Sequence, residues 1–143
     1  MRISDVLNTK GDDVVTVSPD TTVRELVDLL AEHNIGAAVV STPGAAVTGI
    51  VSERDVVRRL AHGSDVLDAP VSEIMTGDVR TAAPDESVVS LMKLMSEHRV
   101  RHVPVVVDGE LRGLVSIGDV VKSRIGELEF ERDQLSSYVT NPQ

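Results

Sequence analysis

The sequence predicts an α+β fold in which two copies of one βαββα unit form a pseudo-symmetric pair with a shared core, followed by a long helix. Three observations lead to this prediction: an internal repeat, the same order of strand-like and helix-like periodicities in each copy, and an aliphatic composition. Hydrophobic residues make up 41% of the 143 residues, which is sufficient for a sizeable core. Two copies are too few for a solenoid, so we expect a closed pair.

The repeat places residues 14–40 over residues 78–106. Its clearest matches are Pro-Asp at 19–20 and 84–85, Glu-His at 32–33 and 97–98, and the segments GIVSERDVV (49–57) and GLVSIGDVV (113–121). The residues before each copy also correspond, as SDVL (4–7) and SEIM (72–75). We therefore divide the chain into a first repeat (1–66), a second repeat (67–125) and a C-terminal helical extension (126–143).

Each copy is predicted to begin with a short strand, at 14–17 and at 79–82, that leads through a Pro-Asp turn into a helix. In that helix apolar residues recur at i, i+3, i+4 and i+7, starting from Val23 and from Val88. The pattern Thr22-x-x-Glu25 is typical of a capping box. Two more strands follow, at 37–41 and 46–51 and at 102–107 and 111–115, and Asp108-Gly109 predicts a tight hairpin. A second helix then begins after Ser52 and after Ser116.

The last predicted helix, from about 117 to 138, extends beyond the repeat. Its partial apolar stripe consists of Val121, Ile125, Leu128 and Leu135. Either the helix packs on its own domain with a frayed end, or its part from Glu127 to Tyr138 packs against a second subunit. We favour the second interpretation and therefore expect a homodimer.

Composition excludes several classes of function. The net charge of −9 repels nucleic acid and anionic lipid, and an aromatic content of 1% leaves almost no platform for base stacking. Without cysteine there is neither a disulfide framework nor a thiolate metal site. No apolar run has the length of a signal peptide or a membrane span, so we expect a cytoplasmic protein with no nucleic-acid or membrane partner.

The most specific motif is a duplicated G-h-V-S-x-x-D, where h is a hydrophobic residue, at 49–55 and at 113–119. In each copy it lies where a strand ends and a helix begins. A serine there offers a hydroxyl beside free helical N–H groups, which suits a phosphate, and the aspartate in the first turn can accept hydrogen bonds from ribose hydroxyls. The alternative is an ordinary helix cap. Two copies at matching points of a repeat favour the binding interpretation.

With these motifs the chain resembles tandem CBS-domain proteins of the stand-alone bacterial type, whose paired repeats are called a Bateman module. The resemblance covers roughly residues 1–125 and also includes the h-x-T-V-x-P-D turn and the strand within residues 98–107. It implies that the two repeats pack sheet to sheet about a pseudo-twofold axis. It also implies two clefts between the repeats for AMP, ADP, ATP, NAD-type ligands or S-adenosylmethionine.

The resemblance further implies that each cleft combines both repeats. The first cleft would contain Ile50, Ser52, Asp55, Thr76, Val79, Arg101 and His102. The second would contain Val14, Gly36, Ala37, Leu114, Ser116 and Asp119, with Arg54 reaching across from the neighbouring motif. Because the first repeat has Gly36-Ala37 where the second has Arg101-His102, the two clefts are not equivalent, and one of them could be filled alone.

We therefore expect a non-catalytic regulatory module for adenine nucleotides, with no required cofactor, no metal site of its own, and Mg²⁺ only in company with ATP. The regulated protein would be a separate chain. Two alternatives stay open: an interaction scaffold with vestigial clefts, and a sensor of NAD(H) or S-adenosylmethionine. The sequence contains no catalytic triad order, no glycine-rich phosphate loop and no metal-ligand cluster, which disfavours an enzyme.

Overall fold

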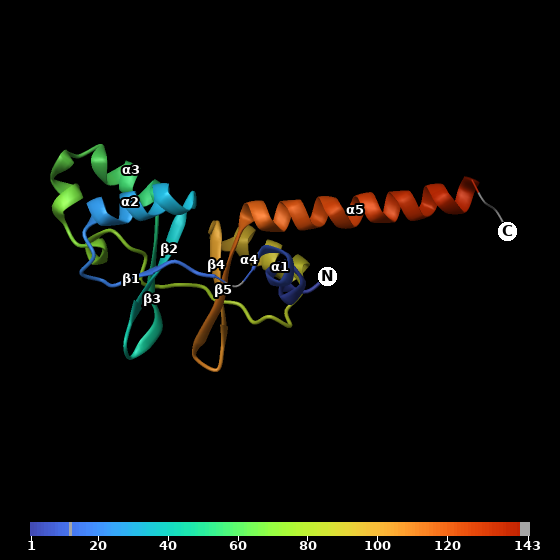
Figure 1. Ribbon diagram of the computed structural model, residues 1–143, viewed down its shortest axis with the longest axis horizontal. Coiled ribbons are helices and arrows are strands. Elements are labelled where there is room, and N and C mark those ends of the chain that lie inside the picture. Colours follow the sequence, from blue (N-terminus) through green and yellow to red (C-terminus); the bar gives the residue numbers. More distant parts are fainter. Residues whose placement is uncertain (12, 141–143) are drawn as a thin grey trace.

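The computed structural model describes residues 1–11 and 13–140. Two small α/β units lie next to each other, and the last helix projects away from them (Figure 1). In chain order the helices and strands are α1 (Ile3–Lys10), β1 (Thr16–Val17), α2 (Val23–His33), β2 (Ala37–Thr42), β3 (Ala45–Ser52), α3 (Glu53–Leu60), η1 (Ser64–Asp68), η2 (Val71–Glu73), α4 (Val88–His98), β4 (His102–Val107), β5 (Glu110–Ser116) and α5 (Ile117–Thr140).

The two sheets are similar but not identical. In the first, β1 is parallel to β2 and β2 is antiparallel to β3; in the second, β4 and β5 form an antiparallel pair. Strands β3 and β5 contact each other, so the sheets meet as predicted. The strand predicted at 79–82 is wrong: only Ala82 pairs, through one parallel bridge to Val105. Its preceding residues leave the sheet edge and line a cavity instead.

Local sequence signals explain where the helices and the hairpin begin and end. Thr22 Oγ1 accepts a hydrogen bond from the backbone N–H of Glu25 at 3.1 Å, which is the N-cap half of the predicted capping box. At its other end, α2 stops at Asn34 in the left-handed conformation, with φ 51°. Asp108 and Gly109 both have positive φ, 51° and 79°, which confirms the predicted tight turn between β4 and β5.

Each repeat completes its hydrophobic core with the leader of the other repeat. By leader we mean the segment at the start of a repeat: α1 in the first repeat, and the chain from η2 to Asp78 in the second. Ile3, with α1, packs in a cluster with α4 and the β4–β5 pair of the second repeat. Val71, from the segment before the second repeat, packs with α2 and the first sheet. Backbone hydrogen bonds fix both exchanges, from Ile3 N to Glu86 O at 2.9 Å and from Val71 N to Thr21 O at 2.8 Å. This exchange couples the folding of the two repeats, because neither core is complete without the other leader.

The last helix, α5, is longer than the predicted one and reaches Thr140. Only its first part lies against the body of the molecule, near α1 and α4 (Figure 1). Val120 is buried in the core of the second repeat. The other large apolar side chains of the helix are about half exposed or more: Ile117, Val121, Ile125, Leu128, Phe130, Leu135, Tyr138 and Val139. The predicted stripe therefore exists and is uncovered within the chain. Among the described residues no helix combines the length and the apolar character that a membrane crossing requires.

Candidate functional site

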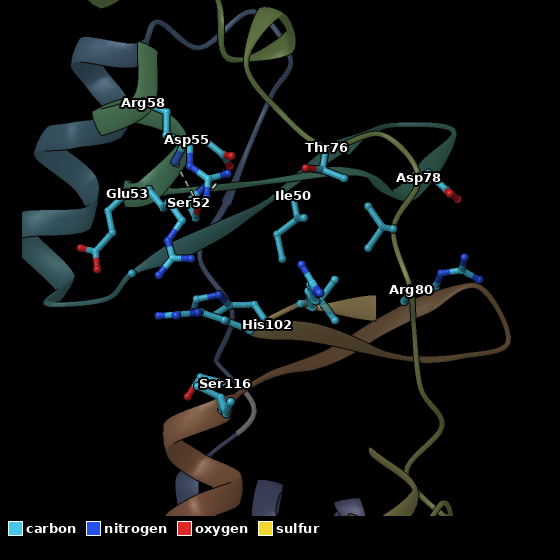
Figure 2. A pocket seen from close by; sticks show the side chains of 17 residues that line it. Ile50, Ser52, Glu53, Asp55, Arg58, Thr76, Asp78, Arg80, His102 and Ser116 are labelled. Atoms are coloured by element: carbon cyan, nitrogen blue, oxygen red, sulfur yellow. Dashed lines mark hydrogen bonds between the residues drawn. The ribbon is translucent and has the colours of Figure 1, made fainter. Parts of the chain in front are cut away.

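A cavity of about 390 Å³ lies between the two repeats. Figure 2 shows its walls: the end of β3 with the start of α3 on one side, the start of β4 on another, and the segment from Thr76 to Arg80 beside them. All seven residues predicted for the first cleft line this cavity: Ile50, Ser52, Asp55, Thr76, Val79, Arg101 and His102. Sequence positions as far apart as 50 and 102 thus meet in one place.

The Ser52–Asp55 motif is formed by the junction of β3 and α3. Ser52 N donates to Asp55 Oδ2 at 2.8 Å, Ser52 Oγ donates to the same oxygen at 3.1 Å, and Asp55 N donates to Ser52 Oγ at 3.3 Å. This is a reciprocal helix cap. The cap uses Oδ2, whereas Oδ1 of Asp55 accepts no hydrogen bond from the residues that the structure describes. Capping therefore leaves one carboxylate oxygen available to a ligand.

The segment around Thr76 is held against β3 by a small antiparallel bridge. Ile50 N donates to Thr76 O at 3.0 Å, and Thr76 N donates to Ile50 O at 2.9 Å. Gly49 makes this approach possible, because a Cβ at that position would lie 2.6 Å from Met75 Sδ and 3.0 Å from Thr76 O. The bridge keeps the chain from Thr76 to Arg80 extended along the cavity as its wall.

The cavity is basic although the protein is acidic. Its lining includes five of the fourteen lysine and arginine residues of the chain, against three carboxylates, Glu53, Asp55 and Asp78. None of the five arginines forms an ion pair with a residue in the described part of the chain. Unpaired guanidinium groups around a concave surface are suited to phosphate. These arginines are Arg54, Arg58, Arg80, Arg99 and Arg101.

Sequence reasoning did not assign Arg58, Arg80 and Arg99 to a site. For Arg58 a signal exists, because it lies one helical turn after Asp55 and so on the same face of α3. No comparable signal exists for Arg80 and Arg99. They reach the cavity through the path of the segment between the repeats and through the left-handed end of α4 at Arg99, where φ is 53°.

His102 lines the cavity and faces the first repeat (Figure 2). Burial lowers the pKa of His102 below its ordinary value, and the charge of Lys10 lowers it further, while the carboxylates of Asp119 and Glu53 act in the opposite direction. A Cβ built on Gly36 would lie 3.7 Å from His102 Nε2, an ordinary van der Waals distance, so Gly36 and His102 are neighbours across the interface between the repeats.

The second predicted cleft is not gathered into one cavity. Gly36, Arg54 and Ser116 line the first cavity instead. Ala37 is buried opposite Ser52 in the β2–β3 ladder. Val14 and Leu114 are half-buried, and Asp119 borders a groove between α1 and α5. The predicted approach of Arg54 to Asp119 is not found: the cation beside Asp119 is Lys10, at 2.6 Å from Nζ to Oδ2. The reason is the leader exchange, which carries α1 to the start of α5.

Asp119 otherwise repeats the cap geometry of Asp55. Ser116 N donates to Asp119 Oδ2 at 2.9 Å, and Asp119 N donates to Ser116 Oγ at 3.2 Å. Burial alone would raise the pKa of Asp119, but the hydrogen bonds from Lys10 and Ser116 outweigh it and hold that pKa below its ordinary value. Asp119 is therefore ionised and already paired within the protein. No group of histidines and carboxylates in the described part of the chain is arranged to hold a metal ion.

Comparisons with known proteins agree with this architecture. The family model of the CBS domain matches residues 3–62 and 71–126. The chain is 37% identical over 146 residues to the mitochondrial CBS domain-containing protein CBSX3 of Arabidopsis thaliana, covering 96% of this chain and 71% of that protein. It is also 38% identical over 109 residues to an inosine-5′-monophosphate dehydrogenase of Korarchaeum cryptofilum, covering 76% of this chain but only 22% of that enzyme.

Solved structures share the fold over most of their length. A CBS-domain containing protein of Agrobacterium tumefaciens has a TM-score of 0.83 at 43% identity, covering 87% of this chain and 99% of that one. A CBS domain protein of Pyrobaculum aerophilum, solved with AMP, has a TM-score of 0.75 at 33% identity, covering 83% and 89%. The CBS domain pair of protein MJ0100, solved with 5′-methylthioadenosine and S-adenosyl-L-methionine, has a TM-score of 0.79 at 26% identity, covering 89% and 98%. With two matched repeats over most of its length, the chain belongs to the CBS-domain family.

Proposed function

We propose that the chain is a non-catalytic regulatory module that binds a phosphorylated adenosine, AMP, ADP or ATP, in the cavity at Asp55. The observation that carries this proposal is the set of five unpaired arginines around the Ser52–Asp55 motif. The cavity volume of about 390 Å³ falls within the range of roughly 300–1,000 Å³ that small-molecule sites occupy. The AMP complex of the Pyrobaculum protein is consistent with it.

In the proposed complex, each part of the ligand meets a matching group. The free oxygen of Asp55 accepts hydrogen bonds from the ribose hydroxyls, and Ile50 and Val79 provide apolar contacts for the adenine ring. The arginines of the opposite wall, Arg80 and Arg99 among them, neutralise the phosphates, and Ser52 lines the same cavity beside Asp55. ATP would bring Mg²⁺ with it.

The charge of the cavity discriminates among the ligands of the family's solved structures. S-adenosylmethionine carries a positive sulfonium beside a single carboxylate, and 5′-methylthioadenosine has no anionic group, so neither offers a phosphate to the arginines. NAD(H), with its pyrophosphate, is the competing candidate. A catalytic role is not supported, because within the described residues the hydroxyl of Ser52 has hydrogen bonds only with Asp55, as part of the cap of α3.

Titration calorimetry with AMP, ADP, ATP, NAD⁺ and S-adenosylmethionine tests the proposal. We expect binding of the mononucleotides and a loss of about 10- to 100-fold in affinity for Asp55→Ala, since hydrogen bonds to a charged group contribute about 1.5–3 kcal/mol. Asp65→Ala, which removes an exposed carboxylate from η1, is the matched control and should bind like the parent protein. Equal affinity of Asp55→Ala and parent, or no binding at millimolar nucleotide, would contradict the proposal.

We also propose that the exposed stripe of α5 packs against α5 of a second copy in antiparallel orientation. A projecting helix is marginally stable in water unless its apolar face is covered. The first half of the helix carries Asp119 and Glu127 besides Lys122 and Arg124, so its charges balance, whereas the second half, with Glu129, Glu131 and Asp133 against Arg132, is acidic. Antiparallel pairing keeps the two acidic halves apart, whereas parallel pairing aligns them.

Sedimentation velocity across a concentration series tests this arrangement. Leu128→Glu and Leu135→Glu should shift the protein from dimer to monomer, because each places a charge in the proposed seam. Gln134→Glu adds the same charge away from the stripe and should leave the dimer intact. A monomeric parent protein, or a dimer that tolerates both leucine substitutions, would rule out α5 as the dimer contact.

A further inference from the structure

The carboxylate of Asp119 is paired with a cation of the protein itself, whereas Asp55 has no such partner among the described residues. Lys10 Nζ lies 2.6 Å from Asp119 Oδ2 and 2.6 Å from the carbonyl oxygen of Leu114. The two charged side chains are only partly exposed, 36% for Lys10 and 24% for Asp119. Leu114 is the counterpart of Ile50 in the repeat, so Lys10 contacts both the acidic residue and the backbone of the residue predicted as the apolar wall of the second cleft.

The residue at the equivalent place in the first cleft is Asp78. The leaders align as LNTK (7–10) and MTGD (75–78). In the first cleft the carbonyl of Ile50 accepts a hydrogen bond from the backbone of Thr76, and the chain continues past it as an open wall. In the second cleft the carbonyl of Leu114 accepts from the Lys10 side chain instead. The same repeat position therefore carries a lysine in one leader and an aspartate in the other. The lysine binds across the second cleft, whereas the aspartate lines the cavity of the first.

Local conformation explains the difference. The first leader stays helical as far as Lys10, and Gly11, with φ 98°, then ends α1 with a hydrogen bond to Leu7 O. The second leader has only a single 3-10 turn, Val71–Glu73, and is no longer helical at Gly77. Glycine disfavours helix continuation. The helical leader places its last lysine at the start of α5, whereas the non-helical leader lines a cavity.

A ribose at Asp119 would meet the ammonium group of Lys10, which binds Asp119 Oδ2 and the carbonyl oxygen of Leu114. Oδ1 of Asp119, like Oδ1 of Asp55, accepts no hydrogen bond from the described residues. The five unpaired arginines all line the other cavity. The groove beside Asp119 is lined by Lys10, Lys122 and Glu127, and the carboxylate of Glu127 is paired with Arg124. Asp119 therefore differs from Asp55 in that Lys10 already compensates its charge and its groove has no comparable cluster of unpaired cations for phosphate.

We propose that Lys10 closes the second cleft from within, so that each chain binds one adenine nucleotide, at Asp55. This inference rests on the proposed function for the identity of the ligand. In it, Lys10 is a positioning residue that ties α1 to α5 and excludes a second ligand.

The test counts nucleotide sites per chain by titration calorimetry with AMP. We expect one site in the parent protein and two in Lys10→Met, which keeps the length and the apolar stem of the side chain but removes its charge. Lys10→Gln serves as the second variant if Lys10→Met fails to fold. Lys93→Met, which removes an exposed lysine from α4, is the matched control and should keep one site. The double variant Lys10→Met/Asp119→Ala should return to one site, which assigns the new site to Asp119.

The outcomes separate the two proposals. Two sites in the parent protein, or one site in both folded Lys10 variants, overturn the closure by Lys10 while leaving binding at Asp55 intact. A parent protein that binds no nucleotide overturns the proposed function. In that case a site gained by Lys10→Met and lost in the double variant would still support the closure, and no gain would overturn it as well.

Discussion

The two clefts of this module are built on nearly the same sheets and the same Ser-x-x-Asp cap, yet they differ in what covers them. At Asp55 the cover is an extended segment that leaves a cavity with unpaired arginines. At Asp119 it is the end of α1, whose lysine bonds to the aspartate. Part of this difference lies within the repeats, where Arg101-His102 stands in place of Gly36-Ala37. The rest arises in the leaders, the short segments at the start of each repeat, which the sequence repeats least clearly.

The comparison teaches that a duplicated module can specialise without changing its duplicated motif. Both aspartates cap a helix, so both have a structural role whether or not a ligand binds to them. The leader then decides which carboxylate is paired with a cation of the protein. Because each leader packs in the core of the opposite repeat, a change in one leader alters the cleft of the other half.

The largest loss of stability is expected when a side chain that one leader places in the core of the other repeat is truncated. Ile3 is fully buried among residues of the second repeat, so Ile3→Ala should lower the free energy of unfolding by about 2–5 kcal/mol. Val71→Ala makes the reciprocal change with fewer methyl groups and should cost less. Urea denaturation measures both. Hydrogen exchange should rise first in α4 and β4 for Ile3→Ala but in α2 and β2 for Val71→Ala; the same pattern in both variants would refute the exchange.

A smaller effect should distinguish the two glycines that the leaders approach. A Cβ on Gly49 would meet both Met75 Sδ and the backbone oxygen of Thr76, whereas a Cβ on Gly113 would meet only the side chain of Leu7. Because backbone cannot move aside as a side-chain end can, Gly49→Ala should cost about 1–3 kcal/mol and Gly113→Ala less. Thermal unfolding of the two variants checks the order. A larger loss in Gly113→Ala would show that the side chain of Leu7 yields less than the chain at Met75 and Thr76, and would contradict this order.

The smallest effect concerns pH, through His102. Since the pKa of His102 is lowered in the folded protein, the unfolded chain takes up a proton as the pH falls through about 6.5 and the folded chain resists it. Stability should therefore fall between pH 7.5 and 5.5, and fall less in His102→Gln. Asp119 does not contribute in this window: its lowered pKa gives stability above about 3.8 that is lost only at more acidic pH. Equal pH slopes in parent and variant would contradict this assignment.

Much of the fold was predictable because its signals are local. The apolar spacing from Val23 and from Val88, the Asp108-Gly109 turn and the two Ser-x-x-Asp caps each depend on residues close in sequence, and the structure contains all of them. The prediction of a strand at 79–82 was wrong because Val79 and Arg80 line the cavity wall. The bridge between Ile50 and Thr76 sets the path of the chain there and overrides strand propensity. The first cleft was assembled from the right residues only because the resemblance to a family supplied the pairing of the repeats.

The sequence by itself determined that there are two similar units and where most of their strands and helices lie. It also determined which serine ends the last strand of each unit and which aspartate lies in the first turn of the helix that follows. Those features follow from hydrophobic period, turn residues and caps, which act within a few neighbouring positions. Only the tertiary structure decided which aspartate is paired with a lysine. The ion pair of Lys10 with Asp119 joins residues 109 positions apart, and the arginines of the cavity come from three separate segments. Electrostatic contacts of this kind depend on distance in space, which the order of residues along the chain does not specify.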